Sequence, residues 1–124
     1  MAHRLDPPEG RPYLDPEEVV RRLRDEFAHC EADADQGADI VGDMVAKLIE
    51  LNAPQQIIDT AMAGRDRSLR VTVADDALSD VYLSFVVRPG AGLLIGYYSG
   101  RHEVAARPVL ERCARALGYD ATVV

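Results

Sequence analysis

Several features that mark secreted, metal-binding or membrane proteins are missing from this chain of 124 residues. It has no tryptophan, and its two cysteines, Cys30 and Cys113, lie far apart without a metal-binding or redox motif. They predict two thiols in a reducing cytosol, with a single disulfide as the alternative. No segment reaches the run of about 18 apolar residues that spans a bilayer, and residues 1–12 lack the apolar core of a signal peptide. We therefore expect a soluble, cytoplasmic protein with no membrane partner.

Length and charge narrow the class of protein further. The length corresponds to one domain, because a single core usually organises about 100–150 residues. The net charge at pH 7 is −7. Residues 1–63 carry 14 acidic and 6 basic side chains, and residues 64–124 carry 7 and 8, so the negative charge lies in the first half. A negative chain repels nucleic-acid phosphates, and we expect no nucleic-acid partner.

The first predicted helix follows a proline-rich start. Residues 1–14 contain three prolines and a glycine and are expected to form a flexible arm, whereas residues 15–124 form a single α+β domain. Asp15 can accept a backbone hydrogen bond as N-cap, Pro16 suits the first turn, and Glu18 occupies the capping-box position. A helix is therefore predicted to begin here.

An apolar stripe continues from this helix start, with spacings that alternate between three and four residues as in a heptad repeat. Its members are Val20, Leu23, Phe27, Cys30, Ala34, Gly37, Val41, Met44, Leu48 and Leu51. One continuous helix over residues 16–51 would be about 54 Å long and would imply a coiled-coil dimer. The alternative, which we favour, is an antiparallel helical hairpin broken around Asp35–Asp39, where Gly37 weakens a helix by about 1 kcal/mol.

Strands are predicted in the middle of the chain. A short third helix from Pro54 to Ala63 precedes them and ends at Gly64. Between Leu69 and Tyr98, three runs alternate apolar and polar residues with a period of two, which indicates half-buried strands. The apolar parity comprises Leu69, Val71, Val73, Val81, Leu83, Phe85, Val87, Leu93, Ile95 and Tyr97. Two intervening loops make these runs an antiparallel three-stranded meander.

The C-terminal part completes the predicted α+β fold. A helix extends to Leu117, and Pro108 either opens it or lies inside a helix that begins near Arg101. Residues 119–124 form a closing strand at the sheet edge. In the order of its elements (helix, three strands, helix, strand), this small acidic chain is similar to the type III secretion chaperones; the likeness covers no motif and transfers no residue.

Two groups of ligand-type residues invite a metal hypothesis, and neither supports it. The acidic side chains are Glu31, Asp33, Asp35, Asp39 and Asp43. A calcium loop starting at Asp33 would need glycine at its sixth position and glutamate at its twelfth, where this chain has Ala38 and Met44. His29, Cys30 and Glu31 are adjacent, and neighbours on a helix point about 100° apart. We predict no metal site and no cofactor.

A second hypothesis concerns the turn after the third strand. Ser99, Gly100, Arg101 and His102 precede the C-terminal helix, where free backbone N–H groups and two basic side chains could hold an anion. The segment lacks the repeated glycines of a phosphate loop. A small anionic-ligand-binding protein, or a modest enzyme with a pocket near Ser99–Glu103, is therefore the alternative function.

The sheet face opposite the core parity carries the leading hypothesis. It is less polar than a solvated face should be, because Tyr82, Val86, Leu94 and Tyr98 can cluster across neighbouring strands. Helices covering both faces of the sheet would explain the pattern without any function. Aromatic residues among arginines are also typical of interfaces. We therefore expect a non-catalytic protein-binding module (an adaptor, chaperone or regulator) that forms a homodimer through this face.

Overall fold

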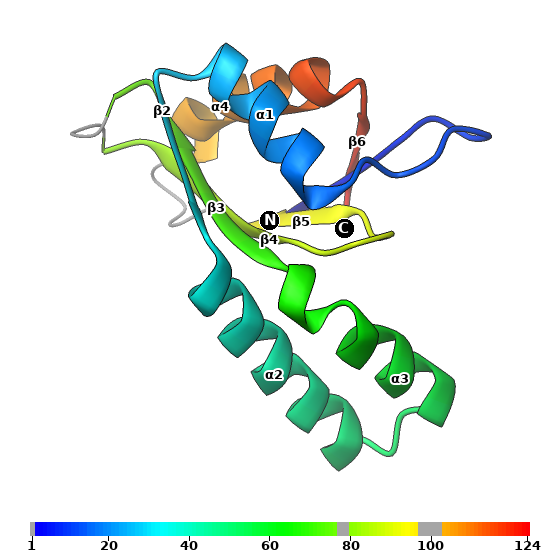
Figure 1. The fold of residues 1–124 in the computed structure, drawn as a ribbon. Coiled ribbons are helices and arrows are strands. Elements are labelled where there is room, and N and C mark those ends of the chain that lie inside the picture. Colours follow the sequence, from blue (N-terminus) through cyan, green and yellow to red (C-terminus); the bar gives the residue numbers. More distant parts are fainter. Residues whose placement is uncertain (1, 77–79, 97–102) are drawn as a thin grey trace.

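The computed structural model describes residues 2–76, 80–96 and 103–124. Over these residues the chain forms four α-helices and two three-stranded antiparallel sheets (Figure 1), which confirms the α+β class. None of the described helices is long and apolar enough to cross a bilayer.

The first sheet has the N-terminus at its centre. Its order is β5-β1-β6, formed by β5 (Leu93–Gly96), β1 (Ala2–Asp6) and β6 (Asp120–Val123). Strand β1 lies within the segment expected to be a flexible arm, and its residue Leu5 is completely buried. Its pairing partners lie some 90 and 120 residues along the chain, so no local pattern marks the strand. The predicted closing strand is confirmed as a strand, β6, but it pairs with β1 and so lies at the edge of this sheet and not at the edge of the predicted meander.

The second sheet contains an unpredicted edge strand. Its order is β2-β3-β4, formed by β2 (His29–Asp33), β3 (Leu69–Ala74) and β4 (Tyr82–Val87). The antiparallel pair of β3 and β4 is confirmed. The meander is confirmed only that far, because β5 pairs with β1 in the other sheet. The two sheets meet where β4 contacts β5.

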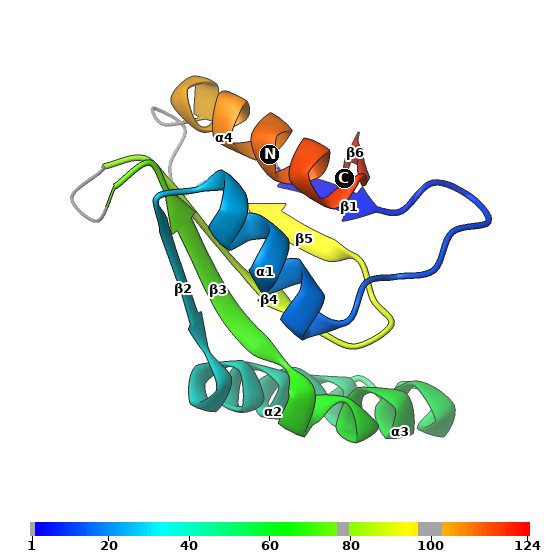
Figure 2. The same ribbon diagram turned by 45° about the horizontal axis from the view of Figure 1, so that its top comes forward.

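The main core lies on the face that the alternation predicted. Helices α1 (Pro16–Glu26) and α4 (Glu103–Leu117) cover this face together, and α2 (Ala34–Glu50) and α3 (Gln55–Ala63) lie on the opposite side (Figure 2). Among the residues of the predicted apolar parity, those buried in the strands are Val71, Val73, Leu83, Phe85, Val87, Leu93 and Ile95. Helix α4 begins at Glu103 within the described residues and contains Pro108, so the proline does not open it. Gly118, with φ of +68°, ends the helix.

The predicted N-terminal helical hairpin is wrong. Strand β2 separates α1 from α2 (Ala34–Glu50), and the expected break at Asp35–Asp39 lies inside α2. The side chain of Asp33 accepts a hydrogen bond from the Gln36 N–H at 2.8 Å and so caps α2 after the strand. Strand β1 precedes the helices and β2 separates α1 from α2. The element order on which the likeness to type III secretion chaperones rested is therefore not the observed one.

Helix α2 pairs with the third helix instead of with α1. The third helix is confirmed as α3 (Gln55–Ala63), with Pro54 at its N-cap and Gly64 at its C-cap. The two helices form a hairpin with a small core of its own, consisting of Val41, Val45, Ile58 and Ala61. This hairpin projects from the body that carries the sheets (Figure 1).

Candidate functional site

The residues of the predicted interface differ in their exposure. Val86 is half-buried and packs against the core of the α2–α3 hairpin, so this part of the face is already covered. Leu94 on β5 is 60% exposed. Tyr82 is half-buried, and Tyr98 lies outside the described residues. The four side chains were expected to form one patch, and among the described three only Leu94 is strongly exposed.

The predicted anion site cannot be compared with the structure. Ser99, Gly100, Arg101 and His102 lie outside the described residues, which resume at the first residue of α4.

Helix α2 is seated on the second sheet by close backbone contact and by arginine hydrogen bonds. A Cβ atom at Gly37 would lie 2.7 Å from the Leu69 Cα, so only glycine allows this approach. Arg70 donates hydrogen bonds to the Gln36 side chain at 2.8 Å and to the Ser84 hydroxyl at 3.1 Å. Arg65 donates to the Ala38 carbonyl at 3.0 Å. These contacts hold the α2–α3 hairpin against the second face of the sheet, which the sequence predicted to be a protein interface.

A first groove, called the sheet groove here, lies between α2 and the second face of the strands. It has a volume of about 410 Å³. Its lining residues are Ile40, Arg70, Ser84, Phe85, Val86 and Gly96. Gly96 follows Leu94 on the same face of β5 by strand periodicity, so the groove leads toward the exposed leucine.

A second groove, called the hairpin groove here, lies between α2 and α3. Its volume is about 450 Å³. Its lining residues are Met44, Leu48, Gln56, Ile57, Thr60, Ala61 and Arg88. Arg88 is half-buried and lies directly after β4, two residues beyond Val86. Among the described residues, no hydrogen-bond acceptor or carboxylate meets its guanidinium.

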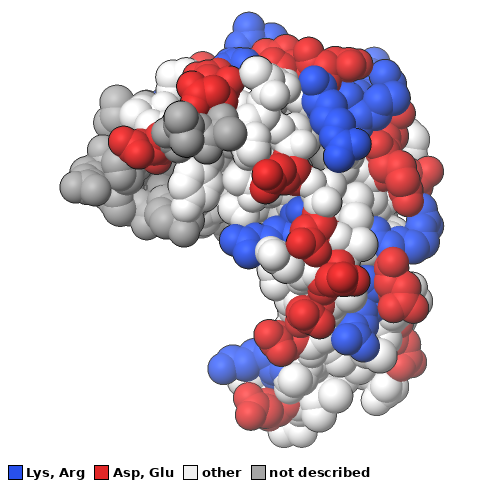
Figure 3. Space-filling model, turned by 60° about the vertical axis from the view of Figure 1, so that its left-hand side comes forward, with Lys and Arg blue, Asp and Glu red and all other residues white. Residues whose placement is uncertain are grey.

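Both grooves run along the same edge of α2. Ile40, Met44 and Leu48 are spaced by four residues and line this edge in turn. Asp39 and Asp43 precede the first two by one residue and are exposed, so an acidic ridge borders the apolar edge. Figure 3 shows the molecule hollowed between its body and the α2–α3 hairpin, with acidic side chains along the hairpin.

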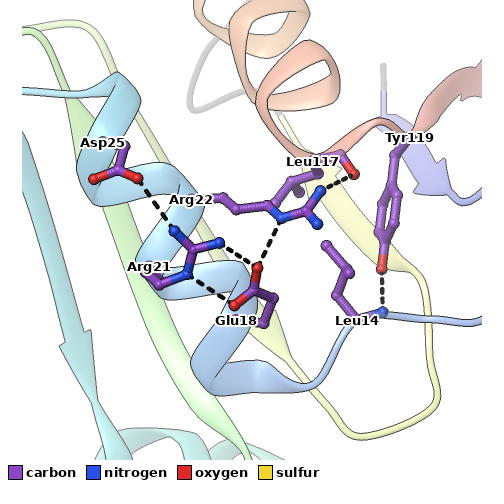
Figure 4. Close-up of polar contacts among 7 residues, drawn as sticks. All are labelled: Leu14, Glu18, Arg21, Arg22, Asp25, Leu117 and Tyr119. Atoms are coloured by element: carbon purple, nitrogen blue, oxygen red, sulfur yellow. Dashed lines mark hydrogen bonds and ion pairs between the residues drawn. The ribbon is translucent and has the colours of Figure 1, made fainter.

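Among the described residues, the largest cluster of ionic contacts is structural. Arg22 on α1 donates to Glu18 at 3.0 Å and to the Leu117 carbonyl at 3.3 Å (Figure 4), which caps the end of α4. The Tyr119 hydroxyl accepts a hydrogen bond from the Leu14 N–H at 2.9 Å and ties in the preceding loop. Because these groups satisfy one another, the cluster holds α1, α4 and the N-terminal loop together.

The two cysteines are poor nucleophiles. Both are free thiols, as predicted, and burial raises the pKa of Cys113 to about 12 and raises the pKa of Cys30 as well. A neutral thiol neither attacks electrophiles nor binds metals readily. Within the described part of the chain, no three His, Cys, Asp or Glu side chains converge in a way that could hold a metal ion.

Comparison with known proteins gives no information on what the two grooves bind, so their interpretation depends on their geometry. The chain matches no known protein family, no curated protein and no solved structure.

Sequence reasoning missed the hairpin groove, although its parts were visible. Met44 and Leu48 belong to the apolar stripe, and Arg88 has the parity of the second sheet face. Nothing in the sequence places Arg88 in one groove with Ile57 of α3, because that arrangement depends on how the hairpin docks against the sheet.

Proposed function

We propose that the protein is a non-catalytic binding module that binds another protein, in the first place a second copy of itself, through the sheet groove and Leu94. The observation that carries this proposal is the exposed Leu94 beside an open, partly apolar groove. Exposed apolar surface next to a groove with a polar rim is typical of interaction sites.

The energetics favour burial of this surface. Complete burial of a leucine or isoleucine side chain contributes about 1.5–3 kcal/mol, and Leu94 and the 38% exposed Ile40 would each contribute part of that. In a two-fold dimer each contact occurs twice, which helps to offset the entropy lost on association.

Charge complementarity supports a second copy as the partner. Arg70 lies in the sheet groove and, among the described residues, meets no carboxylate. Asp39 and Asp43 form the exposed acidic ridge on the other side of Ile40. In a two-fold arrangement the ridge of one copy faces the arginine of the other, so the same surface is self-complementary.

The proposal is tested by sedimentation velocity over a wide concentration range. We expect wild type to form a dimer, and Leu94→Asp to be monomeric because the aspartate would have to be desolvated. Val123→Asp is the matched control, because Val123 is 62% exposed on β6, away from the groove. High salt should weaken the dimer, since it screens the charges.

A wild-type protein that stays monomeric at every concentration would refute the homodimer. A dimer that Leu94→Asp leaves intact would place the interface elsewhere on the molecule. Circular dichroism of Leu94→Asp separates loss of association from loss of folding.

A further inference from the structure

The hairpin groove places a single charged group against an otherwise mainly apolar lining. Met44 and Leu48 contribute from α2, and Ile57 and Ala61 contribute from α3. Arg88, directly after β4, is half-buried at the edge of this lining, without a carboxylate or hydrogen-bond acceptor among the described residues. A guanidinium that has lost part of its hydration and gained no partner favours an incoming anion.

We propose that the hairpin groove binds a small amphipathic carboxylate, with the carboxylate paired to Arg88 and the alkyl chain between Met44 and Ile57. The volume of about 450 Å³ lies within the range of about 300–1,000 Å³ found for small-molecule sites. Guanidinium and carboxylate match as planar, two-pronged partners. This inference does not rest on the proposed dimer, because Leu94 does not line the hairpin groove.

The polar residues of the groove favour one carboxylate over a phosphate. Thr60 donates its hydroxyl proton to the Gln56 carbonyl at 2.8 Å, so this group is engaged within its own helix. The Gln56 side-chain amide and Arg88 remain as donors at the groove. A phosphate carries up to two negative charges, and Arg88 is the one positive group among the described residues that line the groove, so the second charge would stay uncompensated.

Calorimetric titration with octanoate tests the role of the ligand's negative charge. Octanol has the same alkyl chain without the charge and serves as the control ligand. We expect octanoate to bind about tenfold or more tightly than octanol, because a charge-assisted pair adds to the same alkyl contacts. From hexanoate to octanoate, each added methylene should tighten binding by about fourfold while the groove has room.

Two substitutions separate the role of Arg88 from that of the apolar lining. Arg88→Gln should weaken octanoate to about the affinity of octanol, whereas Arg107→Gln, at an exposed arginine on α4, should change neither. Ile57→Ser should weaken both ligands together. Ile57 is 51% exposed, so its truncation should not unfold the chain.

The methionine methyl groups report where the ligand lies. In a carbon–proton NMR spectrum, octanoate should shift the Met44 methyl signal, because Met44 lines the groove. Met62 is 47% exposed on α3 outside the lining and should not shift.

A fatty acid and the carboxyl terminus of an apolar peptide share this chemistry. Titration with the tripeptide Ala-Leu-Leu, with a free or an amidated C-terminus, distinguishes them. Tighter binding of the free peptide than of octanoate assigns the site to peptide termini, and the reverse assigns it to fatty acids; both outcomes support the carboxylate site. Equal affinities for octanoate and octanol, no effect of Arg88→Gln, or a shift at Met62 instead of Met44 would each overturn it.

Discussion

At the scale of single residues, two glycines of α2 differ in how much space their surroundings leave for a side chain. Gly37 is buried where the helix touches the backbone of Ser68 and Leu69. At Gly42, an added Cβ would meet only the flexible side chain of Arg65, at 3.4 Å. The stripe pattern predicted a weak point at Gly37, but the residue is required there because the strand backbone lies too close for any side chain.

The two glycines should therefore respond oppositely to alanine. Gly37→Ala should lower the free energy of unfolding by about 1–3 kcal/mol or more, because the backbone of β3 must shift. Gly42→Ala should raise it by about 0.5–1 kcal/mol through helix propensity. Urea denaturation followed by circular dichroism measures both, and a stabilising Gly37→Ala would contradict the contact with Leu69.

At the scale of elements, α1 and α4 are joined by a charged network that responds to pH. Hydrogen bonds from Arg21 and then from Arg22 lower the pKa of Glu18 from 4.5 to about 2. A carboxyl whose pKa is lower in the folded state stabilises the fold above its unfolded pKa. This stabilisation is present above about pH 4.5 and is lost as the pH falls toward 2.

Glu18→Gln should therefore flatten the acid side of the stability profile. Between pH 5 and pH 2, the melting temperature of wild type should fall more steeply than that of Glu18→Gln, because glutamine cannot titrate. Glu9→Gln, at an exposed position in the loop before α1, should follow wild type. Parallel curves for wild type and Glu18→Gln would show that the network contributes nothing measurable.

The elements themselves were predicted to the extent that they are local. Helix α3 and strands β3, β4 and β5 repeat their apolar residues with the period of their own backbone. Strand β2 was missed because Cys30 and Ala34 also fit helical spacing. The segment is a strand because it pairs with β3, from His29 opposite Ala74 to Asp33 opposite Arg70.

At the scale of the whole molecule, strand β1 pairs the N-terminal end of the chain with its C-terminal end. It pairs with β5 on one side and β6 on the other, and Leu5 reaches the main core. Leu5→Ala should lower the free energy of unfolding by about 2–5 kcal/mol through the cavity that it leaves. Arg4→Ala, at an exposed position next to it, should cost little, because a surface ion pair contributes about 0–1 kcal/mol.

Removal of residues 1–6 tests the same strand more severely. The truncated chain should lose cooperative thermal unfolding, because β5 and β6 would lose the strand between them. A truncated protein that melts like wild type would show that β1 is dispensable, as a flexible arm would be.

The sequence by itself determined the buried parity of β3, β4 and β5, the start of α1, the third helix and the closing strand. Each of these follows from the spacing of neighbouring residues. Only the tertiary structure decided that β1 and β2 are strands, that the α2–α3 hairpin covers Val86, and that Arg88 and Ile57 line one groove. Strand pairing and helix docking join residues that are distant in the chain, and their free energy depends on partners that no local window contains.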